Sequence, residues 1–348
     1  MPNSNNPSVL VIYTGGTIGM IKDTITGALR PFDWDHLYRQ MPVLENLRCK
    51  IDSYSFDPLI DSSDMNPSFW VRLADVIEQN YESYDGFVVL HGTDTMAYTA
   101  SMLSFMLENL NKPVVFTGSQ LPMGVIRTDG RENFIASIEI ATACEEGTPI
   151  VPEVCICFEN KLFRANRTIK FNAENFDAFL SGNYPPLAEV GIHIKYNRSH
   201  ILKPNFKKLR IHRGIDTNVA VLRLFPGISP GTVCGILNIE GLKGVVLETY
   251  GSGNAPTDQW FLDAIGRAIE KGVHVYNVTQ CKSGSVEIGL YQTSVSLGRI
   301  GVIGGYDITT ESALAKLMFL LGMGLDNKQI NTLLSQSLRG ELTATKEN

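Results

Sequence analysis

The sequence predicts an α/β protein with two domains, a larger one built on a mostly parallel sheet and a smaller one that follows it in the chain. The length of 348 residues exceeds what one hydrophobic core usually supports. The content of 44% hydrophobic and 19% charged residues is ordinary for globular proteins. Short apolar runs alternate with amphipathic stretches, and this order is typical of βαβ units.

In the first part of the chain, four short apolar runs have the length and composition of buried strands. They are Ser8 to Tyr13, Gly86 to His91, Pro113 to Thr117 and Val154 to Phe158. Between them, apolar residues recur at helical spacing in three stretches. These are Ser68 to Asn80, Thr95 to Asn109 and Asp129 to Ala143. The alternation predicts a parallel sheet covered by helices.

The same alternation resumes later in the chain and predicts the smaller domain. Its expected strands are 219–224, 244–247, 273–277 and 301–303, and its expected helices are 258–270, 311–322 and 328–338. The segment before it is basic, is interrupted by Pro204 and lacks regular periodicity, so we expect a linker. The expected organisation is a catalytic domain of residues 1–194, a linker of 195–215 and a second domain of 216–348.

Charge and composition exclude several classes of partner. With 30 Lys plus Arg against 36 Asp plus Glu, the net charge of −6 argues against nucleic acid. The first residues lack a signal-peptide pattern, and no apolar stretch approaches the roughly 20 residues of a membrane span, so we expect a cytoplasmic protein without membrane contact. The six cysteines lack zinc-ligand spacing, which favours reduced, mostly buried thiols and neither metal nor cofactor.

The first predicted strand ends in a glycine-rich turn that contains a threonine, Thr14. The turn reads Tyr13-Thr14-Gly15-Gly16-Thr17-Ile18-Gly19, and its glycines would let backbone N–H groups approach an anion or a carbonyl oxygen. A tight structural turn or a nucleotide-binding loop are the alternatives. Neither the dinucleotide nor the Walker spacing is present, so the nucleotide alternative is not supported.

Polar residues also follow the next predicted strands, at the edge where ligands bind in open α/β sheets. The second strand leads into His91-Gly92-Thr93-Asp94-Thr95, where a Thr or Asp could equally be a helix N-cap. The third leads into Thr117-Gly118-Ser119-Gln120, and Lys170 closes the later segment Asn166 to Lys170. An isolated lysine is usually a surface charge, so the combination of segments carries the argument.

Together these segments resemble the asparaginase family. The matching residues are Thr14 in its TGGTIG turn, Asp61 to Met65, His91 to Thr95 and Asn166 to Lys170, in this order. The whole chain, from Val9 to Leu342, is more closely similar to the bacterial type I, cytoplasmic L-asparaginases. The resemblance implies a flavodoxin-like N-terminal domain and a smaller C-terminal α/β domain. It also implies hydrolysis of L-asparagine to L-aspartate and ammonia, and it is compatible with minor L-glutaminase activity.

The resemblance also implies the roles of individual residues. Thr14 is expected to be the nucleophile, while Thr93, Asp94 and Lys170 form a second constellation for proton transfer. Because a threonine hydroxyl is a poor nucleophile, a base must take its proton, and a partly desolvated lysine can serve. Backbone N–H groups of Gly15 and Thr93 are candidate donors to the oxyanion. Direct attack by water, activated by Thr93 and Lys170, is a competing mechanism.

The substrate is a zwitterion, which requires groups for both of its charges. The resemblance implies that Ser62 and Ser63 bind the α-carboxylate and that Asp94 receives the α-amino group. Ser119 is a further candidate for substrate binding. Asn254 matches a family position that reaches a neighbouring subunit's active site, which implies a homodimer or homotetramer. A structural turn explains the segment around Asn254 equally well.

The chain departs from the family pattern at two places. Relatives carry a tyrosine in the loop after the first strand, whereas the stretch Lys22 to Arg30 has Ala28 or Leu29 near that position. A relative's allosteric site uses a threonine, an arginine and a cysteine where this chain has Ile169, Glu248 and Cys281. Since Glu248 would repel a ligand carboxylate, we expect this regulatory site to be absent or altered.

Two other functions remain open from the sequence. The chain could be a glutaminase or the amidase subunit of a tRNA-dependent amidotransferase, although that subunit usually carries an additional N-terminal domain. It could also be a catalytically silent amino-acid sensor on the same fold, because fold alone does not establish function. Ammonia release from asparagine by the purified protein would exclude the sensor.

Overall fold

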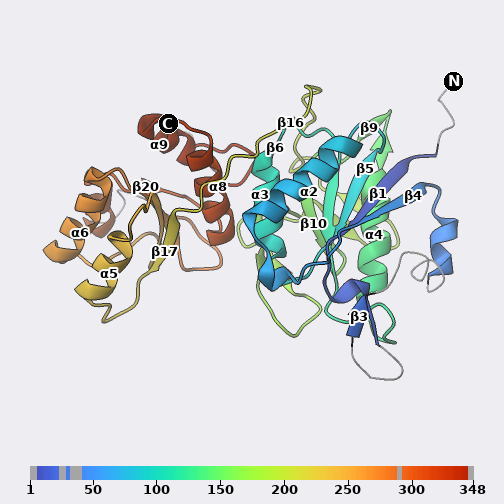
Figure 1. Ribbon diagram of the computed structural model, residues 1–348, viewed down its shortest axis with the longest axis horizontal. Coiled ribbons are helices and arrows are strands. Elements are labelled where there is room, and N and C mark those ends of the chain that lie inside the picture. The colour runs from blue at the N-terminus through green and yellow to red at the C-terminus, as the bar shows by residue number, and fades with distance from the viewer. Residues whose placement is uncertain (1–5, 23–28, 32–40, 288–291, 344–348) are drawn as a thin grey trace. The chain divides into compact units, whose positions relative to one another are not determined.

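The computed structural model describes residues 6–22, 29–31, 41–287 and 292–343 (Figure 1). The chain divides into two compact units. Unit 1 comprises Met1–Ser181 with Pro185–Ile211, and unit 2 comprises Gly182–Tyr184 with His212–Asn348. Each unit contains its own sheet, as the sequence predicts.

Unit 1 is built on a sheet in which eight described strands follow the order β15-β14-β11-β10-β7-β5-β1-β4. The five from β4 to β10 pair in parallel, and the remaining three pair antiparallel. The prediction of a mostly parallel sheet is confirmed. The strands are β1 (Ser8–Tyr13), β4 (Lys50–Ser55), β5 (Gly86–Leu90), β7 (Val114–Thr117), β10 (Val154–Phe158), β11 (Lys161–Arg164), β14 (Ala188–Val190) and β15 (Ile194–Tyr196).

The helices of unit 1 are α2 (Pro67–Asn80), α3 (Met96–Met106) and α4 (Gly130–Thr142). Asn66 caps α2 because its side chain accepts a hydrogen bond from the Phe69 N–H at 3.3 Å. Helix α3 ends earlier than the expected Asn109. Its last predicted residues instead form β6 (Leu107–Glu108), which pairs with β16 (Arg210–Ile211).

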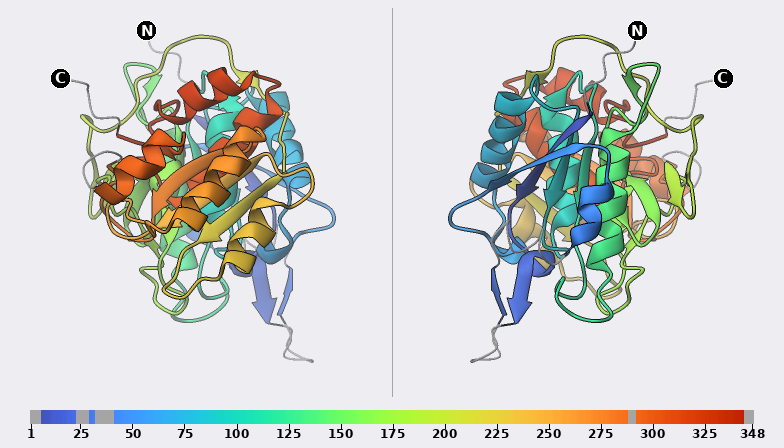
Figure 2. Two further views of the ribbon diagram at one scale, coloured as in Figure 1. Left: turned by 90° about the vertical axis from the view of Figure 1, so that its left-hand side faces the viewer. Right: turned by 90° about the vertical axis from the view of Figure 1, so that its right-hand side faces the viewer.

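The sheet of unit 1 lies between two layers of helices. Figure 1 shows α2 and α3 on one side of the strands and α4 on the other, and the turned views of Figure 2 agree. Every residue of β5, β7 and β10 is buried. This two-sided burial explains why these strands consist of continuous apolar runs.

Short elements lie between the main strands and helices of unit 1 in the chain. Among the described residues, these include two-stranded pairings and single 3₁₀ turns. The pairings join β2 (Met20–Lys22) to β3 (Leu29–Pro31), β8 (Cys144–Glu145) to β9 (Thr148–Pro149), and β12 (Ile169–Lys170) to β13 (Phe179–Leu180). The 3₁₀ turns are η1 (Thr17–Gly19), η2 (Pro42–Asn46), η3 (Ser62–Asp64) and η4 (Ala165–Arg167).

Unit 2 contains a four-stranded parallel sheet in the order β17-β18-β19-β20. Its strands are β17 (Val219–Arg223), β18 (Gly244–Thr249), β19 (His274–Thr279) and β20 (Ile303–Gly304). Its helices are α5 (Pro230–Leu237), α6 (Gln259–Glu270), α7 (Gln292–Arg299), α8 (Thr310–Gly322) and α9 (Asn327–Leu334). In Figure 1, α5 and α6 lie on one side of the strands and α8 and α9 on the other.

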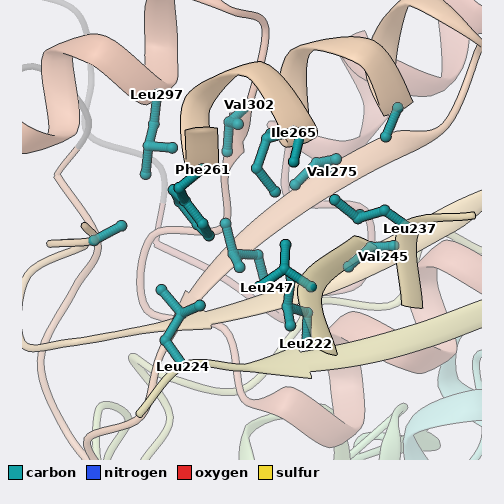
Figure 3. Packing of buried hydrophobic residues seen from close by; sticks show 14 of the residues in the cluster. Leu222, Leu224, Leu237, Val245, Leu247, Phe261, Ile265, Val275, Leu297 and Val302 are labelled. Atoms are coloured by element: carbon teal, nitrogen blue, oxygen red, sulfur yellow. The ribbon is translucent and has the colours of Figure 1, made fainter. Parts of the chain in front are cut away.

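Aliphatic and aromatic side chains form most of the core between the sheet of unit 2 and its helices α5 and α6. Leu222 of β17, Leu247 of β18 and Val275 of β19 face Phe261 and Ile265 of α6 (Figure 3). Each of these five side chains is inaccessible to solvent. Burial of such side chains stabilises a fold by roughly 1.5–3 kcal/mol each.

Several elements differ from the sequence-based expectation. The expected linker, 195–215, contains most of β15 and all of β16, since pairing with neighbouring strands orders it without apolar periodicity. Of the cysteines, Cys155 and Cys157 are buried but Cys144 and Cys281 are exposed, so the expectation of mostly buried thiols is wrong. In the part of the chain that the structure describes, no helix is both long and apolar enough to cross a bilayer.

A buried ion pair fixes the segment after α9 to unit 2. The Lys316 ammonium of α8 lies 2.7 Å from Glu341 Oε1, and both side chains are fully inaccessible. Lys316 also donates to the Leu334 carbonyl, while Glu341 accepts from the Leu338 and Arg339 N–H groups. Because these hydrogen bonds compensate for the loss of hydration, the charges tolerate burial only together.

We expect Glu341→Gln to destabilise unit 2 by about 3–5 kcal/mol, because it leaves the Lys316 ammonium buried without its carboxylate. Native-state hydrogen exchange of the β18 amides would measure this change. Lys243→Met is the matched control, because the Lys243–Asp216 pair is half exposed at the lysine and should contribute less than about 1 kcal/mol. Equal effects of the two substitutions would contradict the prediction.

Candidate active site

The carboxyl ends of β1, β5 and β7 meet at one edge of the sheet of unit 1. Main-chain hydrogen bonds join the first residue beyond one strand to the last residue of the neighbouring strand. The Thr14 N–H donates to the Leu90 carbonyl at 3.0 Å, and the His91 N–H donates to the Thr117 carbonyl at 3.0 Å. The three polar segments of the sequence are therefore neighbours in space.

Glycines allow the loops at this edge to approach one another without side chains between them. A Cβ atom on Gly16 would lie 2.5 Å from the Gly92 nitrogen, and one on Gly15 would lie 2.1 Å from the Ile60 carbonyl oxygen. The φ angles of 138° at Gly15 and 92° at Gly16 also disfavour other residues. The turn after β1 thus packs by its backbone against two other loops.

Thr14 lies at the buried floor of this edge. Its side chain is 1% exposed, and its hydroxyl donates to the Leu90 carbonyl at 2.9 Å. The Thr14 carbonyl accepts from the Ile60 N–H at 2.9 Å. On the preceding residue, the buried Tyr13 hydroxyl donates to the Gly19 carbonyl at 2.9 Å. These bonds hold the turn from Thr14 to Gly19 at both of its ends.

Lys170 joins two of the candidate residues that follow β5. Its Nζ lies 2.8 Å from Thr93 Oγ1 and 2.6 Å from Asp94 Oδ1. The Lys170 side chain is 18% exposed, whereas Asp94 is 66% exposed. The N-cap of α3 is Thr95, which makes no side-chain cap bond. Thr93 and Asp94 therefore face the lysine, and neither serves as the helix cap that the sequence left open.

Ser62 and Ser63 lie on η3, but their environments differ. Ser62 is buried, and a Cβ atom on Gly92 would lie only 2.4 Å from the Ser62 Oγ. The Thr95 hydroxyl donates to the Ser62 carbonyl at 2.6 Å and so ties η3 to the start of α3. Ser63 is exposed and donates to Asp61 Oδ1, and its N–H and hydroxyl lower the pKa of the Asp61 carboxyl.

Ser119 belongs to the loop that follows β7. Its hydroxyl donates to the Leu121 carbonyl at 2.6 Å. The next residue, Gln120, donates through its side chain to the Ala173 and Asn175 carbonyls, which follow Lys170 in the chain. Asp129 accepts from the Gln120 N–H. This loop therefore supports the segment that carries Lys170.

Asn254 belongs to unit 2. It forms a tight turn with Tyr250, in which each residue donates its N–H to the other's carbonyl, at 2.8 and 2.9 Å. Gly253, between them, has a φ of 107°. The structural turn that the sequence offered as an alternative is thus present, and a role toward a second subunit stays a prediction.

The three residues that correspond to a relative's allosteric site lie in separate parts of the chain. Ile169 is buried in β12. Glu248 is buried in β18, where Arg223 Nη1 at 3.1 Å and the Thr310 hydroxyl at 2.6 Å contact its carboxylate. Cys281 is exposed. Of the loop stretch without tyrosine, Ala28 lies outside the described residues, and the Leu29 side chain is likewise not described.

His91 is a titratable group that is fully buried at this edge of the sheet. It is inaccessible to solvent, and its Nδ1 lies 2.7 Å from the Gly92 carbonyl oxygen. Burial lowers the pKa of His91 to about 4, so the ring is neutral at neutral pH. No contact of the His91 or Thr95 side chain could be predicted from the sequence, because the partners of these side chains are not visible in the linear order.

The described residues contain no group of three or more His, Cys, Asp or Glu side chains that could hold a metal ion. The cluster offers hydroxyls, a carboxylate, an amine and backbone N–H groups. Such a set can attack a carbonyl carbon, transfer a proton and stabilise an oxyanion.

Two family descriptions match the chain. "Asparaginase, N-terminal" matches residues 8–202, which are more than half of the chain. "Glutaminase/Asparaginase C-terminal domain" matches residues 218–334. The two matches follow one another in the same order as the two sheets.

Individual proteins match over nearly the whole chain. L-asparaginase 1 of Escherichia coli strain K12 is 44% identical over 345 residues, which are 97% of this chain and 98% of that protein. The 60 kDa lysophospholipase of Mus musculus is 42% identical, but the matching residues are 62% of that longer protein. The crystal structure of L-asparaginase I from Vibrio cholerae has a TM-score of 0.88 at 40% identity, covering 97% of this chain and 99% of its own.

Gly118→Ala should destabilise the protein by about 1–3 kcal/mol, because the added Cβ would lie 2.5 Å from the His91 carbonyl oxygen. Urea unfolding would measure the change. Gly124→Ala is the matched control in the same unit, since no atom lies within 4 Å of its added Cβ. If Gly118→Ala were as stable as Gly124→Ala, the loops would not be in close contact.

His91 should make the stability of the protein sensitive to acid. Its pKa is about 4 in the folded protein and roughly 6.5 when unfolded. As the pH falls from roughly 6.5 to 4, the unfolded state binds a proton before the folded state does, so this contribution is lost. Between about pH 7 and about pH 5, the loss is on the order of 2 kcal/mol.

Urea unfolding at both pH values would measure the acid sensitivity, with His91→Asn as the variant that lacks the titrating ring. We expect the free energy of unfolding of His91→Asn to depend less steeply on pH than that of the unchanged protein. Parallel pH profiles for the two proteins would show that His91 is not buried in its neutral form.

Proposed function

The chain belongs to the asparaginase family and is an asparaginase enzyme, and from this premise we propose that it hydrolyses L-asparagine to L-aspartate and ammonia with Thr14 as the nucleophile. The resemblance of the motif segments to this family is confirmed, because family matches and relatives extend over nearly the whole chain. The residue roles below are part of the proposal.

In the proposed reaction, the Thr14 hydroxyl oxygen attacks the side-chain carbonyl carbon of asparagine. The hydroxyl proton passes to a base, and the carbonyl oxygen becomes an oxyanion. The C–N bond then breaks, and the amide nitrogen leaves as ammonia after it has received a proton. Water hydrolyses the resulting ester, which releases aspartate and restores the hydroxyl.

Lys170 and Thr93 are the proposed proton-transfer pair. The observation that carries the proposal is the contact of Lys170 Nζ with both Thr93 Oγ1, at 2.8 Å, and Asp94 Oδ1, at 2.6 Å. In this arrangement the amine can take a proton from the Thr93 hydroxyl, and the Asp94 carboxylate stabilises the ammonium that forms. The same pair could activate water directly, which is the competing mechanism.

The oxyanion is proposed to bind the backbone N–H groups of Gly15 and Thr93. Both residues belong to loops that pack by their backbones at the strand ends, so these donors are held in place before the reaction. Donors of this kind are worth about 10²–10³-fold in rate when they point at the developing charge.

The two charges of the substrate require different partners. Asp94 is exposed enough to receive the α-ammonium group, and Ser62 and Ser63 are proposed to bind the α-carboxylate. Ser119 is proposed to contact the substrate from the loop after β7. Minor glutaminase activity, a cytoplasmic location and a homodimer or homotetramer that uses Asn254 complete the proposal.

Thr14→Ala should lower kcat for ammonia release from asparagine by about 10³-fold or more, because the attacking oxygen is removed. Thr14→Ser, which keeps a hydroxyl, should retain measurable activity. A coupled assay of ammonia with asparagine and with glutamine would measure both effects and the preference between the two amides.

Thr142→Ala is the matched control for this experiment. Like Thr14, Thr142 donates its hydroxyl to a main-chain carbonyl, that of Ile138 at 2.8 Å, but Thr142 is only partly buried and lies at the end of α4. Its kcat should equal that of the unchanged enzyme. Activity of Thr14→Ala at the level of Thr142→Ala would remove Thr14 from the mechanism and favour direct attack by water.

A further inference from the structure

His91 occupies a site in which a polar ring has little to bond to. It directly follows β5, its side chain is fully buried, and its ring lies 5.9 Å from that of Phe116. Its Nε2 atom has no hydrogen-bond partner among the described residues. A buried polar atom without a partner is costly, so the ring must provide something that an apolar side chain would not.

The bond to Gly92 determines which nitrogen of the ring carries the proton. A carbonyl oxygen can only accept, so Nδ1, which lies 2.7 Å from the Gly92 oxygen, must be the donor. In the neutral ring, Nε2 then carries the lone pair. The hydrogen bond from Nδ1 is therefore directed at the peptide group between Gly92 and Thr93.

Gly92 needs such a constraint, because its own conformation is poorly restricted. A side chain at this position would collide with Ser62 Oγ, 2.4 Å from the Cβ site, so glycine is required. Glycine, however, leaves the backbone free to rotate. A hydrogen bond that holds the Gly92 carbonyl offsets this freedom.

Holding the Gly92 carbonyl also fixes the Thr93 N–H. The two groups belong to one planar trans peptide and point in opposite directions. We propose that His91 is a positioning residue, which holds the Gly92–Thr93 peptide so that the Thr93 N–H points at the oxygen that becomes negatively charged in the reaction. This inference rests on the proposed function, in which the Thr93 N–H stabilises the oxyanion.

The test compares His91→Phe with His91→Asn. Phenylalanine keeps the aromatic packing against Phe116 but cannot donate to the Gly92 carbonyl. Asparagine can place its amide N–H near the position of Nδ1. We expect His91→Phe to lower kcat for asparagine about tenfold or more and to leave KM within about twofold, because an oxyanion donor acts in the transition state and not on the bound substrate.

The variant His91→Asn distinguishes a role of His91 in positioning the Gly92–Thr93 peptide from a role in stabilising the fold. His91→Asn should keep kcat within about threefold of the unchanged enzyme, although it loses the same ring. His274→Phe is the matched control in unit 2, since His274 is also buried and bonds through Nδ1, to Asn331 Oδ1 at 2.6 Å. Its kcat should be unchanged.

Three results would overturn the proposal for His91. These are an unchanged kcat in His91→Phe, an equal loss of kcat in His91→Phe and His91→Asn, and a rise in KM without a fall in kcat. The outcome for Thr14→Ala is independent of all three. An inactive Thr14→Ala together with a fully active His91→Phe would reject the positioning role alone and leave the nucleophile in place.

Discussion

The close packing of backbone against backbone at the strand ends is the constraint on which the rest of the site depends. Glycines stand where the turn after β1 meets the loops that follow β4 and β5, at Gly15 and Gly16, and where the loop after β7 meets His91, at Gly118. Because no side chains separate these loops, main-chain N–H groups and short hydroxyl side chains from distant parts of the chain share one small region. A parallel sheet supplies this geometry, since its strands end at the same edge.

The residues of the cluster differ in their exposure to solvent in a way that suits a small zwitterion. Thr14 and His91 form a floor without access to solvent, whereas Asp94 and Ser63 lie at the exposed rim. Charged groups of a ligand can then remain near water while its amide reaches the buried hydroxyl. Lys170, partly buried between the two levels, contacts both the hydroxyl of Thr93 and the carboxylate of Asp94.

The sequence predicts strands that consist of continuous apolar runs and fails for a strand that has none. Strands β1, β5, β7 and β10 follow from continuous apolar runs, but every residue of β4 is exposed or partly exposed, and β4 has no such run. Helix α5, in which Val233 and Leu237 are buried, was not predicted. In the candidate site, the motifs predict Thr93, Asp94 and Lys170 as a group, and the structure brings the three side chains into contact. The bond from Thr95 to the Ser62 carbonyl, across 33 residues, and the orientation of the His91 ring depend on tertiary distances that no local pattern encodes.

The buried pair of Lys316 and Glu341 has a consequence for the order in which the protein is made. Lys316 is synthesised with α8, but its carboxylate partner comes 25 residues later (341 minus 316), after α9 is complete. A nascent chain that ends at Leu334 would have to bury an ammonium group without a counter-ion or leave α8 detached from the sheet. Folding of unit 2 is thereby delayed until the ribosome has added Glu341, and incomplete chains can be cleaved by proteases.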